Sequence, residues 1–171
     1  AFPNDKDPIT YDNMKKAIGA FERKLITPSK FDDFIKGDAS ALNKTEKEGL
    51  QLFFDKGCTT CHNGNALGGN IFQKFGVFGD YWKLTKSKKI DEGKFEATKN
   101  EADKYIFKSP SLRNIEKTYP YFHDGSIKNL NEAVKIMGKA QLNLDLTDQE
   151  VDKIVTFLNT LTGEVPAEYK L

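Results

Sequence analysis

Apolar residues recur with a helical period near the start of the chain, where three helices are predicted. The first runs from Thr10 to Pro28, which ends it, and the second is short and stops at Gly37. The third ends at Gly57. The segment Thr45-Glu46-Lys47-Glu48 has the form of a capping box, so we expect it to open this third helix.

A helical period returns in the last third of the chain. One helix is predicted from about Asn129, and the final helix starts with a second capping box, Thr147-Asp148-Gln149-Glu150. Gly163 follows as the C-terminal stop. The apolar face of the final helix is expected to be buried and carries Val151, Ile154, Val155, Leu158 and Leu161.

Residues 63–110 show neither a helical nor an alternating period, and glycines separate scattered aromatic residues there. So long an irregular segment is unusual in a compact domain, although a cofactor can supply the apolar surface on which such loops pack. We detect no internal repeat and no ladder of strands. The sequence therefore predicts an all-α fold with long irregular loops.

Candidate chemistry is concentrated in Cys58-Thr59-Thr60-Cys61-His62, which holds both cysteines of the chain. The spacing C-x-x-C-H is the attachment signal for a c-type haem. Two thiols three positions apart can each add to a vinyl group of one porphyrin, giving two thioether bonds. The adjoining His62 then offers an imidazole nitrogen to the iron as the first axial ligand.

Other interpretations of the two cysteines are less well supported. A thioredoxin-like redox pair does not call for the adjoining histidine and needs a βαβ context. A structural zinc site requires four ligands, and no further cysteine is available. A disulfide between Cys58 and Cys61 remains the plainest alternative to haem attachment.

Composition limits the partners and the cellular location. The 171 residues carry a net charge of +1, which gives no case for nucleic acid or an anionic membrane as partner. No apolar run approaches the roughly 18 residues that can span a bilayer. A covalent haem is expected to be attached outside the cytoplasmic membrane, so we expect a periplasmic protein. Its leader has then been removed by processing, or the sequence is a fragment.

The second axial position of the iron has four kinds of candidate: Met14, Met137, His123 and the lysines. Met14 is in register with the apolar face of the first helix and suits core packing. We expect Met137 at a helix end, with Gly138 turning the chain so that the thioether points inwards. His123 lies in a turn-prone segment, where a hydrogen-bonding role is more typical than ligation. The residues alone favour Met137 over His123.

The sequence resembles the bacterial dihaem cytochrome c peroxidases and their methylamine-utilisation relatives over nearly its whole length. The resemblance implies a class I cytochrome c-like haem domain in residues 41–171, preceded by an N-terminal helical lead-in, residues 1–40, that corresponds to the connection between the domains of the family. The matching segments are Ala20–Arg23, Phe31-Asp32, Lys36–Asp38, Cys58–Gly64, Phe107–Asn114, Tyr119–Ser126 and Phe157–Gly163.

The resemblance also implies a set of site residues. Met137 falls at the position of the family's axial methionine, and Arg113 resembles an arginine that faces a haem propionate. A calcium ion is implied at backbone carbonyls of Thr118 and Pro120, although a further ligand would come from a domain that is not in this sequence. The implied cofactors are thus one covalent haem c and, in addition, calcium.

The resemblance implies the function of the family's C-terminal, high-potential domain, which accepts electrons from a small donor protein, a cytochrome c or a cupredoxin. The partner is then a peroxidatic haem domain, in cis or in trans, where hydrogen peroxide is reduced. The sequence contains no second C-x-x-C-H. The alternative is a self-sufficient monohaem peroxidase with an open or releasable second ligand, and a ligand sensor or assembly subunit is a third hypothesis.

Overall fold

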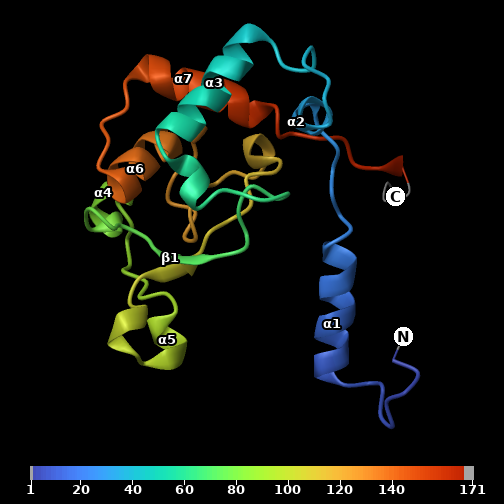
Figure 1. Ribbon diagram of the computed structural model, residues 1–171. Helices are drawn as coiled ribbons and strands as arrows, with labels where there is room; N and C mark the ends of the chain where they lie inside the picture. Colours follow the sequence, from blue (N-terminus) through green and yellow to red (C-terminus); the bar gives the residue numbers. More distant parts are fainter. Residues whose placement is uncertain (1, 168–171) are drawn as a thin grey trace. The chain divides into compact units, whose positions relative to one another are not determined.

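The computed structural model describes residues 2–167, which form two compact units (Figure 1). The smaller unit comprises residues 2–28 and 164–167, and the larger comprises residues 29–163. No helix in the described part of the chain is long and apolar enough to cross a membrane.

The described part of the smaller unit contains one helix, α1 (Tyr11–Glu22). It confirms the predicted start after Thr10, but it ends well before the predicted stop at Pro28. The Thr10 side chain caps it by accepting a hydrogen bond from the backbone of Asn13. The apolar face of α1 is not buried within this unit, because Met14 and Ile18 are each 50% exposed. A helix of this kind normally has its apolar face covered.

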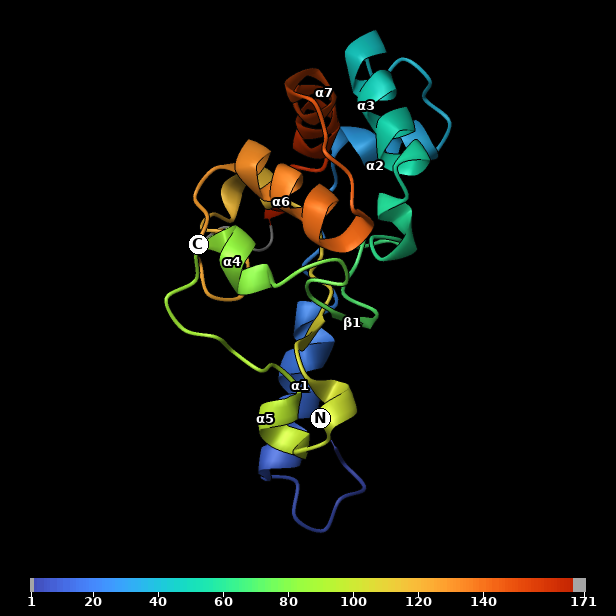
Figure 2. The same ribbon diagram turned by 90° about the vertical axis from the view of Figure 1, so that its left-hand side faces the viewer.

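The larger unit is mainly helical, as predicted, and its elements are joined by long irregular segments (Figures 1 and 2). Its α-helices are α2 (Lys30–Ile35), α3 (Lys44–Asp55), α4 (Tyr81–Thr85), α5 (Phe95–Thr98), α6 (Leu130–Leu142) and α7 (Asp148–Asn159). Its 3-10 helices are η1 (Cys58–Thr60), η2 (Glu101–Asp103) and η3 (Ile115–Lys117).

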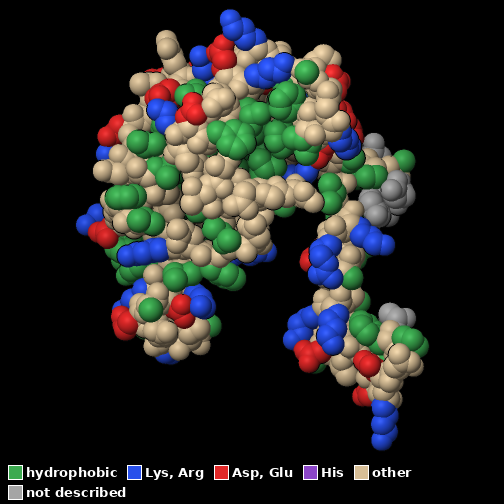
Figure 3. Space-filling view, viewed as in Figure 1, with side chains coloured by type: hydrophobic (Ala, Val, Ile, Leu, Met, Phe, Trp, Pro, Cys, Tyr) green, Lys and Arg blue, Asp and Glu red, His purple; other side chains and the backbone are tan. Residues whose placement is uncertain are grey.

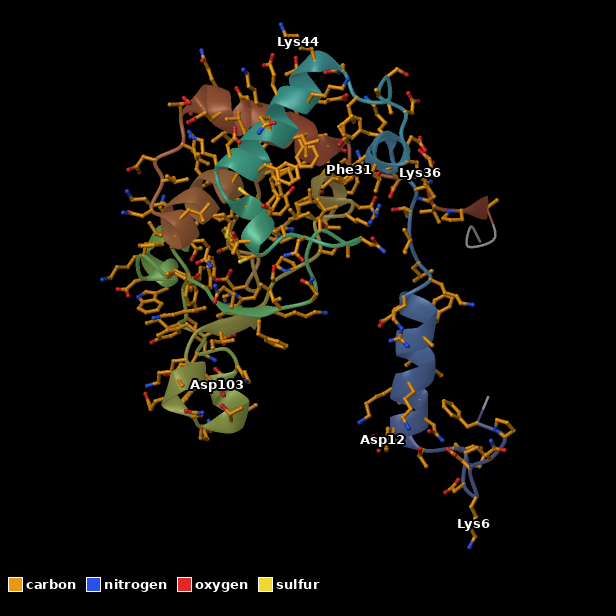
Figure 4. The ribbon with its side chains drawn as sticks, viewed as in Figure 1. Lys6, Asp12, Phe31, Lys36, Lys44 and Asp103 are labelled. Carbon is orange, nitrogen blue, oxygen red and sulfur yellow. The ribbon has the colours of Figure 1, made fainter. Side chains whose placement is uncertain are left out.

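One expectation about strands was wrong. Strands β1 (Phe72–Lys74) and β2 (Ile106–Lys108) form a small antiparallel ladder in which Gln73 lies opposite Phe107. Three residues per strand are too few to produce a recognisable alternation in the sequence. The ladder folds the irregular segment back on itself, so that η2 and Asp103 lie in a small lobe with α5 (Figure 4).

The start of α3 also differs from the prediction. Its capping box is formed by Asn43 and Glu46, not by Thr45 and Glu48. The Asn43 side chain accepts from the backbone of Glu46, and the Glu46 carboxylate accepts from the backbone of Asn43 and from Lys30. The additional ion pair with Lys30 favours this earlier start. The predicted box of α7, between Thr147 and Glu150, is confirmed.

Helices α3 and α7 pack closely against each other in the larger unit (Figures 1 and 2). Gly49 of α3 makes this possible, because a Cβ at Gly49 would lie 2.0 Å from the carbonyl oxygen of Lys153 in α7. Beyond this contact, the ring of Phe53 packs against Phe157 at 5.3 Å between centroids. Phe31 of α2, labelled in Figure 4, contacts the same Phe157 ring edge-on at 5.5 Å.

The buried residues in the described part of the chain form three clusters, and α6 contributes to all of them. The main cluster lies between α3 and α7 and includes the predicted residues Ile154, Leu158 and Leu161. The second cluster contains Tyr121, Ile127, Ala133 and Ile136. The third is aromatic, with Phe75, Tyr81 and Ala140 at its centre.

Gly49→Ala is expected to lower the free energy of unfolding by about 1–3 kcal/mol, because the added Cβ meets backbone that cannot rotate away. This loss should outweigh the better helix propensity of alanine, which amounts to about 1 kcal/mol. Urea unfolding followed by circular dichroism measures the difference. Gly79→Ala is the matched control, since nothing lies within 4 Å of its added Cβ. Equal losses in the two variants would contradict the close helix contact.

Candidate haem-binding site

The C-x-x-C-H segment follows directly on α3. Gly57 takes a φ of +82° and turns the chain out of the helix into η1. The amide of Cys61 then donates to the carbonyl of Cys58 at 3.3 Å, and the amide of His62 donates to the same carbonyl at 3.0 Å. A single tight turn therefore carries both thiols and the imidazole, as attachment of one porphyrin requires.

The His62 imidazole is held in a defined orientation. Its Nδ1 lies 3.2 Å from the carbonyl oxygen of Leu67, and its ring lies against Phe53 with centroids 6.4 Å apart. Burial lowers the pKa of His62, so the neutral form is favoured. A neutral ring that donates from Nδ1 keeps the lone pair of Nε2 for a metal.

Cys58 and Cys61 are not joined by a disulfide. Cys58 packs against the main hydrophobic cluster, and burial raises the pKa of its thiol to about 11. Burial also raises the pKa of Cys61. Such surroundings suit uncharged sulfur, which is the state of a thioether. Among residues 2–167, no group of three or more His, Cys, Asp or Glu side chains is arranged to hold a metal ion, so a zinc-type donor set is not assembled there.

Residues 109–113 fasten the loop that follows the motif, a role that sequence reasoning missed. The Ser109 hydroxyl donates to the carbonyl of Cys61 at 3.2 Å, and the Ser111 hydroxyl donates to the carbonyl of Ala66 at 2.7 Å. The carbonyl of Ser109 accepts from Gly69 at 2.8 Å. The sequence held only two faint signals of this close approach. One is the glycine pair at 68 and 69, and the other is the pair of serines at 109 and 111, much later in the chain.

Arg113 also belongs to this region, and its main partner is Asp32 of α2. Its two terminal nitrogens each donate to one carboxylate oxygen of Asp32, at 2.9 and 2.7 Å, and its Nε donates to the carbonyl of Asn65 at 2.7 Å. Hydrogen bonding to Arg113 holds the pKa of Asp32 far below its usual range. Three of the five guanidinium N–H donors are thus engaged. The propionate contact predicted for Arg113 remains a prediction.

Met137 lies inside α6 and not at a helix end, so that expectation was wrong. The helix continues to Leu142, and Asn143 ends it with a φ of +53°. Gly138 is small because Leu146 packs over it: an added Cβ would lie 2.9 Å from Leu146 Cδ1. The half-buried Met137 side chain packs against the aromatic cluster around Phe75 and Tyr81.

His123, the weaker candidate for the second ligand, lies among aromatic rings. It stacks on Phe107 with centroids 4.2 Å apart and meets Tyr81 edge-on at 5.3 Å. Its Nε2 is 3.9 Å from a carboxylate oxygen of Asp91. This environment suits a histidine that is packed among aromatic rings.

Thr118 and Pro120, the predicted calcium residues, are exposed and lie on either side of Tyr119. The Tyr119–Pro120 peptide bond is cis. The structure brings no cluster of acidic side chains to this place in the described part of the chain. The calcium site therefore remains a prediction that rests on backbone carbonyls alone.

The residues of the motif fit a covalently attached haem. One turn carries two uncharged thiols and an imidazole whose Nδ1 is already hydrogen bonded. Cys58 lies at the main hydrophobic cluster and Met137 lies at the aromatic cluster. Two of the three clusters thus include a residue predicted to hold the haem or to be its second ligand. Hydrophobic side chains also gather around α3 on one face of the larger unit (Figure 3).

Comparison with known proteins decides the family. The cytochrome c sequence profile matches residues 46–162, and the di-haem cytochrome c peroxidase profile matches residues 1–40. Over 96% of its length the chain is 51% identical to a cytochrome c551 peroxidase of Nitrosomonas europaea, and over 100% it is 45% identical to one of Pseudomonas aeruginosa. The chain is a cytochrome c domain of the di-haem cytochrome c peroxidase family. Membership implies a covalently bound haem c.

The chain spans about half of these relatives, covering 48% and 50% of their lengths. A solved MauG-like protein associated with microbial copper homeostasis has the same fold, with a TM-score of 0.74 and 29% identity, over 95% of this chain and 56% of that one. The predicted boundary between residues 40 and 41 remains a prediction. The two profile matches lie on either side of it.

Gly68→Ala is expected to disturb this cytochrome c domain at its haem. With φ at +127°, an added Cβ would lie 2.1 Å from the carbonyl oxygen of Pro110 and 3.1 Å from Nδ1 of His62. We expect a shifted haem absorption spectrum and a lower yield of haem-loaded protein.

Gly69→Ala is the matched control, because it has a φ of +80° and nothing within 4 Å of its added Cβ. It should cost only the backbone strain of about 1–2 kcal/mol, without a spectral change. Identical spectra for the two variants would refute the contact with His62.

Proposed function

We propose that this chain is an electron-transfer module that carries one haem c. Cys58 and Cys61 form the thioether bonds, His62 is the first axial ligand and Met137 is the second. The haem supplies one-electron redox chemistry when bound, and the protein sets its ligands and its burial. The donor would be a small protein, a cytochrome c or a cupredoxin.

The hydrogen bond between Nδ1 of His62 and the carbonyl of Leu67 carries this proposal. It selects the tautomer in which Nε2 is the ligating atom, and it makes the imidazole a stronger donor to iron. Met137 supports the second half of the proposal, since a thioether in an aromatic, apolar surrounding is well suited to a closed iron site. A closed site with His and Met ligands favours electron transfer over binding of small molecules.

The whole protein would be a di-haem peroxidase of the periplasm. Its second haem, on a domain outside this sequence, would reduce hydrogen peroxide with electrons that pass through this module. The relatives are twice as long as this chain and carry the name peroxidase, which supports this role. The exposed apolar face of α1 also supports it, because residues 1–40 match the di-haem peroxidase profile and such a face requires a cover.

Met137→Ala is expected to lower the reduction potential of the haem-loaded chain and to let carbon monoxide bind the ferrous iron, because the second axial position opens. Potentiometric titration and absorption spectra with carbon monoxide measure both effects. Met14→Ala is the matched control. It removes the same type of side chain from α1, where Met14 is 50% exposed. An unchanged potential and spectrum in the Met137 variant would show that Met137 is not a ligand of the iron.

The isolated 171-residue chain is expected to show little peroxide turnover with a reduced cytochrome donor, while it still exchanges electrons with that donor. Steady-state assays of donor oxidation, with and without peroxide, test this. Appreciable turnover by this chain alone would instead support the alternative of a self-sufficient monohaem peroxidase, whose second ligand leaves to admit peroxide.

A further inference from the structure

Three consecutive carbonyls after the haem motif are held by one short segment from later in the chain. Arg113 Nε donates to the carbonyl of Asn65 at 2.7 Å, and the Ser111 hydroxyl donates to that of Ala66 at 2.7 Å. The amide of Leu112 lies 3.3 Å from the carbonyl oxygens of both Ala66 and Leu67. The Leu67 carbonyl is the one that accepts from His62. The position of this acceptor is therefore set by residues 111–113.

Of these three donors, only the Arg113 side chain also hydrogen bonds to a residue of a helix, which is Asp32 of α2. A guanidinium is planar, so fixing one edge of it determines where the remaining N–H groups point. Asp32 fixes that edge with two charge-assisted hydrogen bonds, at 2.9 and 2.7 Å, and both side chains are nearly buried at 11% and 12% exposure. With Asp32 in place, Nε is directed at the Asn65 carbonyl.

Asp32 is itself anchored. Its Oδ2 accepts from the backbone amide and the hydroxyl of Ser29, at 2.8 and 2.9 Å. The neighbouring Phe31 ring contacts Phe157 in the core. The chain of contacts therefore runs from the core, through α2 and the Asp32–Arg113 pair, to the loop that orients the imidazole.

We propose that Asp32 and Arg113 are positioning residues for the axial histidine. The pair holds the backbone at residues 65–67, and thereby holds the hydrogen bond from Nδ1 of His62 to Leu67. Neither residue needs to touch the haem for this role, and Asp32 acts only through Arg113. The inference rests on the proposed ligation of iron by His62.

The test uses the haem-loaded full chain and follows the ring N–H of His62 by proton NMR, in which an imidazole bound to paramagnetic iron gives hyperfine-shifted signals. Asp32→Asn and Arg113→Lys should each speed hydrogen exchange of this N–H by about tenfold, the factor expected when one ordinary hydrogen bond is weakened. Arg113→Lys keeps the positive charge but loses the planar guanidinium, which binds Asp32 with its terminal nitrogens and the Asn65 carbonyl with Nε. If Arg113 served only to pair its charge with a propionate, the exchange rate in this variant would therefore stay close to that of the parent.

Asp103→Asn is the matched control for Asp32→Asn. It also removes a carboxylate charge from an ion pair, with Lys94 at 2.8 Å, and the Asp103 side chain is buried to a similar extent, at 13% exposure. Its exchange rate and hyperfine shifts should equal those of the parent. The double variant Asp32→Asn/Arg113→Lys should be no worse than the more severe single variant, because both act along one path.

Two failures can be told apart. If the parent shows no hyperfine-shifted imidazole, the ligation by His62 is wrong and the proposed function falls with it. If the parent shows it, but Arg113→Lys loses stability without any change in N–H exchange or shifts, the pair only holds α2 and the positioning role is overturned. Arg113→Lys decides this by itself if Asp32→Asn fails to fold.

Discussion

The close approach of α3 to α7 at Gly49 is the contact on which the haem site depends. The motif starts directly after α3, so the packing of that helix fixes where the thiols and the imidazole begin. One aromatic side chain carries the contact further, since Phe53 touches both Phe157 of α7 and the ring of His62. Helix packing and ligand placement are therefore parts of the same arrangement.

The irregular segment between the motif and α6 is ordered by hydrogen bonds and not by regular structure. Residues 109–113 supply hydrogen-bond donors and acceptors to the loop after the motif. The short β1–β2 ladder joins residues 72–74 to residues 106–108, next to this segment in the sequence. Backbone groups in such a loop must find partners when water is excluded. A haem-binding loop can thus be irregular in shape and still hold an imidazole in one orientation.

Helices with strong local signals could be predicted from the sequence, because their causes are local. The capping box at Thr147 and the buried face of α7 were confirmed, and so were the helix that starts after Thr10 and the helix that ends near Gly57. The first of these helices ends at Glu22, well before the predicted stop at Pro28. The start of α3 was missed by two residues because a pairing with Lys30, 16 residues from Glu46, favoured Asn43 as cap. Local periodicity carries no information about such a partner.

The haem motif was recognisable by its spacing, but its surroundings were not. The Asp32–Arg113 pair joins positions 81 residues apart, and neither residue type indicates the other. The environment of Met137 was misjudged for a similar reason. Gly138 suggested a turn, whereas the structure uses its small size to let Leu146 pack against a continuing helix. Glycine has both uses, and only the tertiary contact distinguishes them.

The position of Met137 within α6 has a consequence for the rate of electron exchange. A thioether carried on a loop can swing away when the loop opens, but α6 contributes to all three hydrophobic clusters and has its backbone fixed along its length. If Met137 is the second ligand, as we propose, its sulfur would keep nearly the same place in the oxidised and the reduced state. Little nuclear rearrangement would then accompany each electron, which is the property that the proposed electron-transfer role needs.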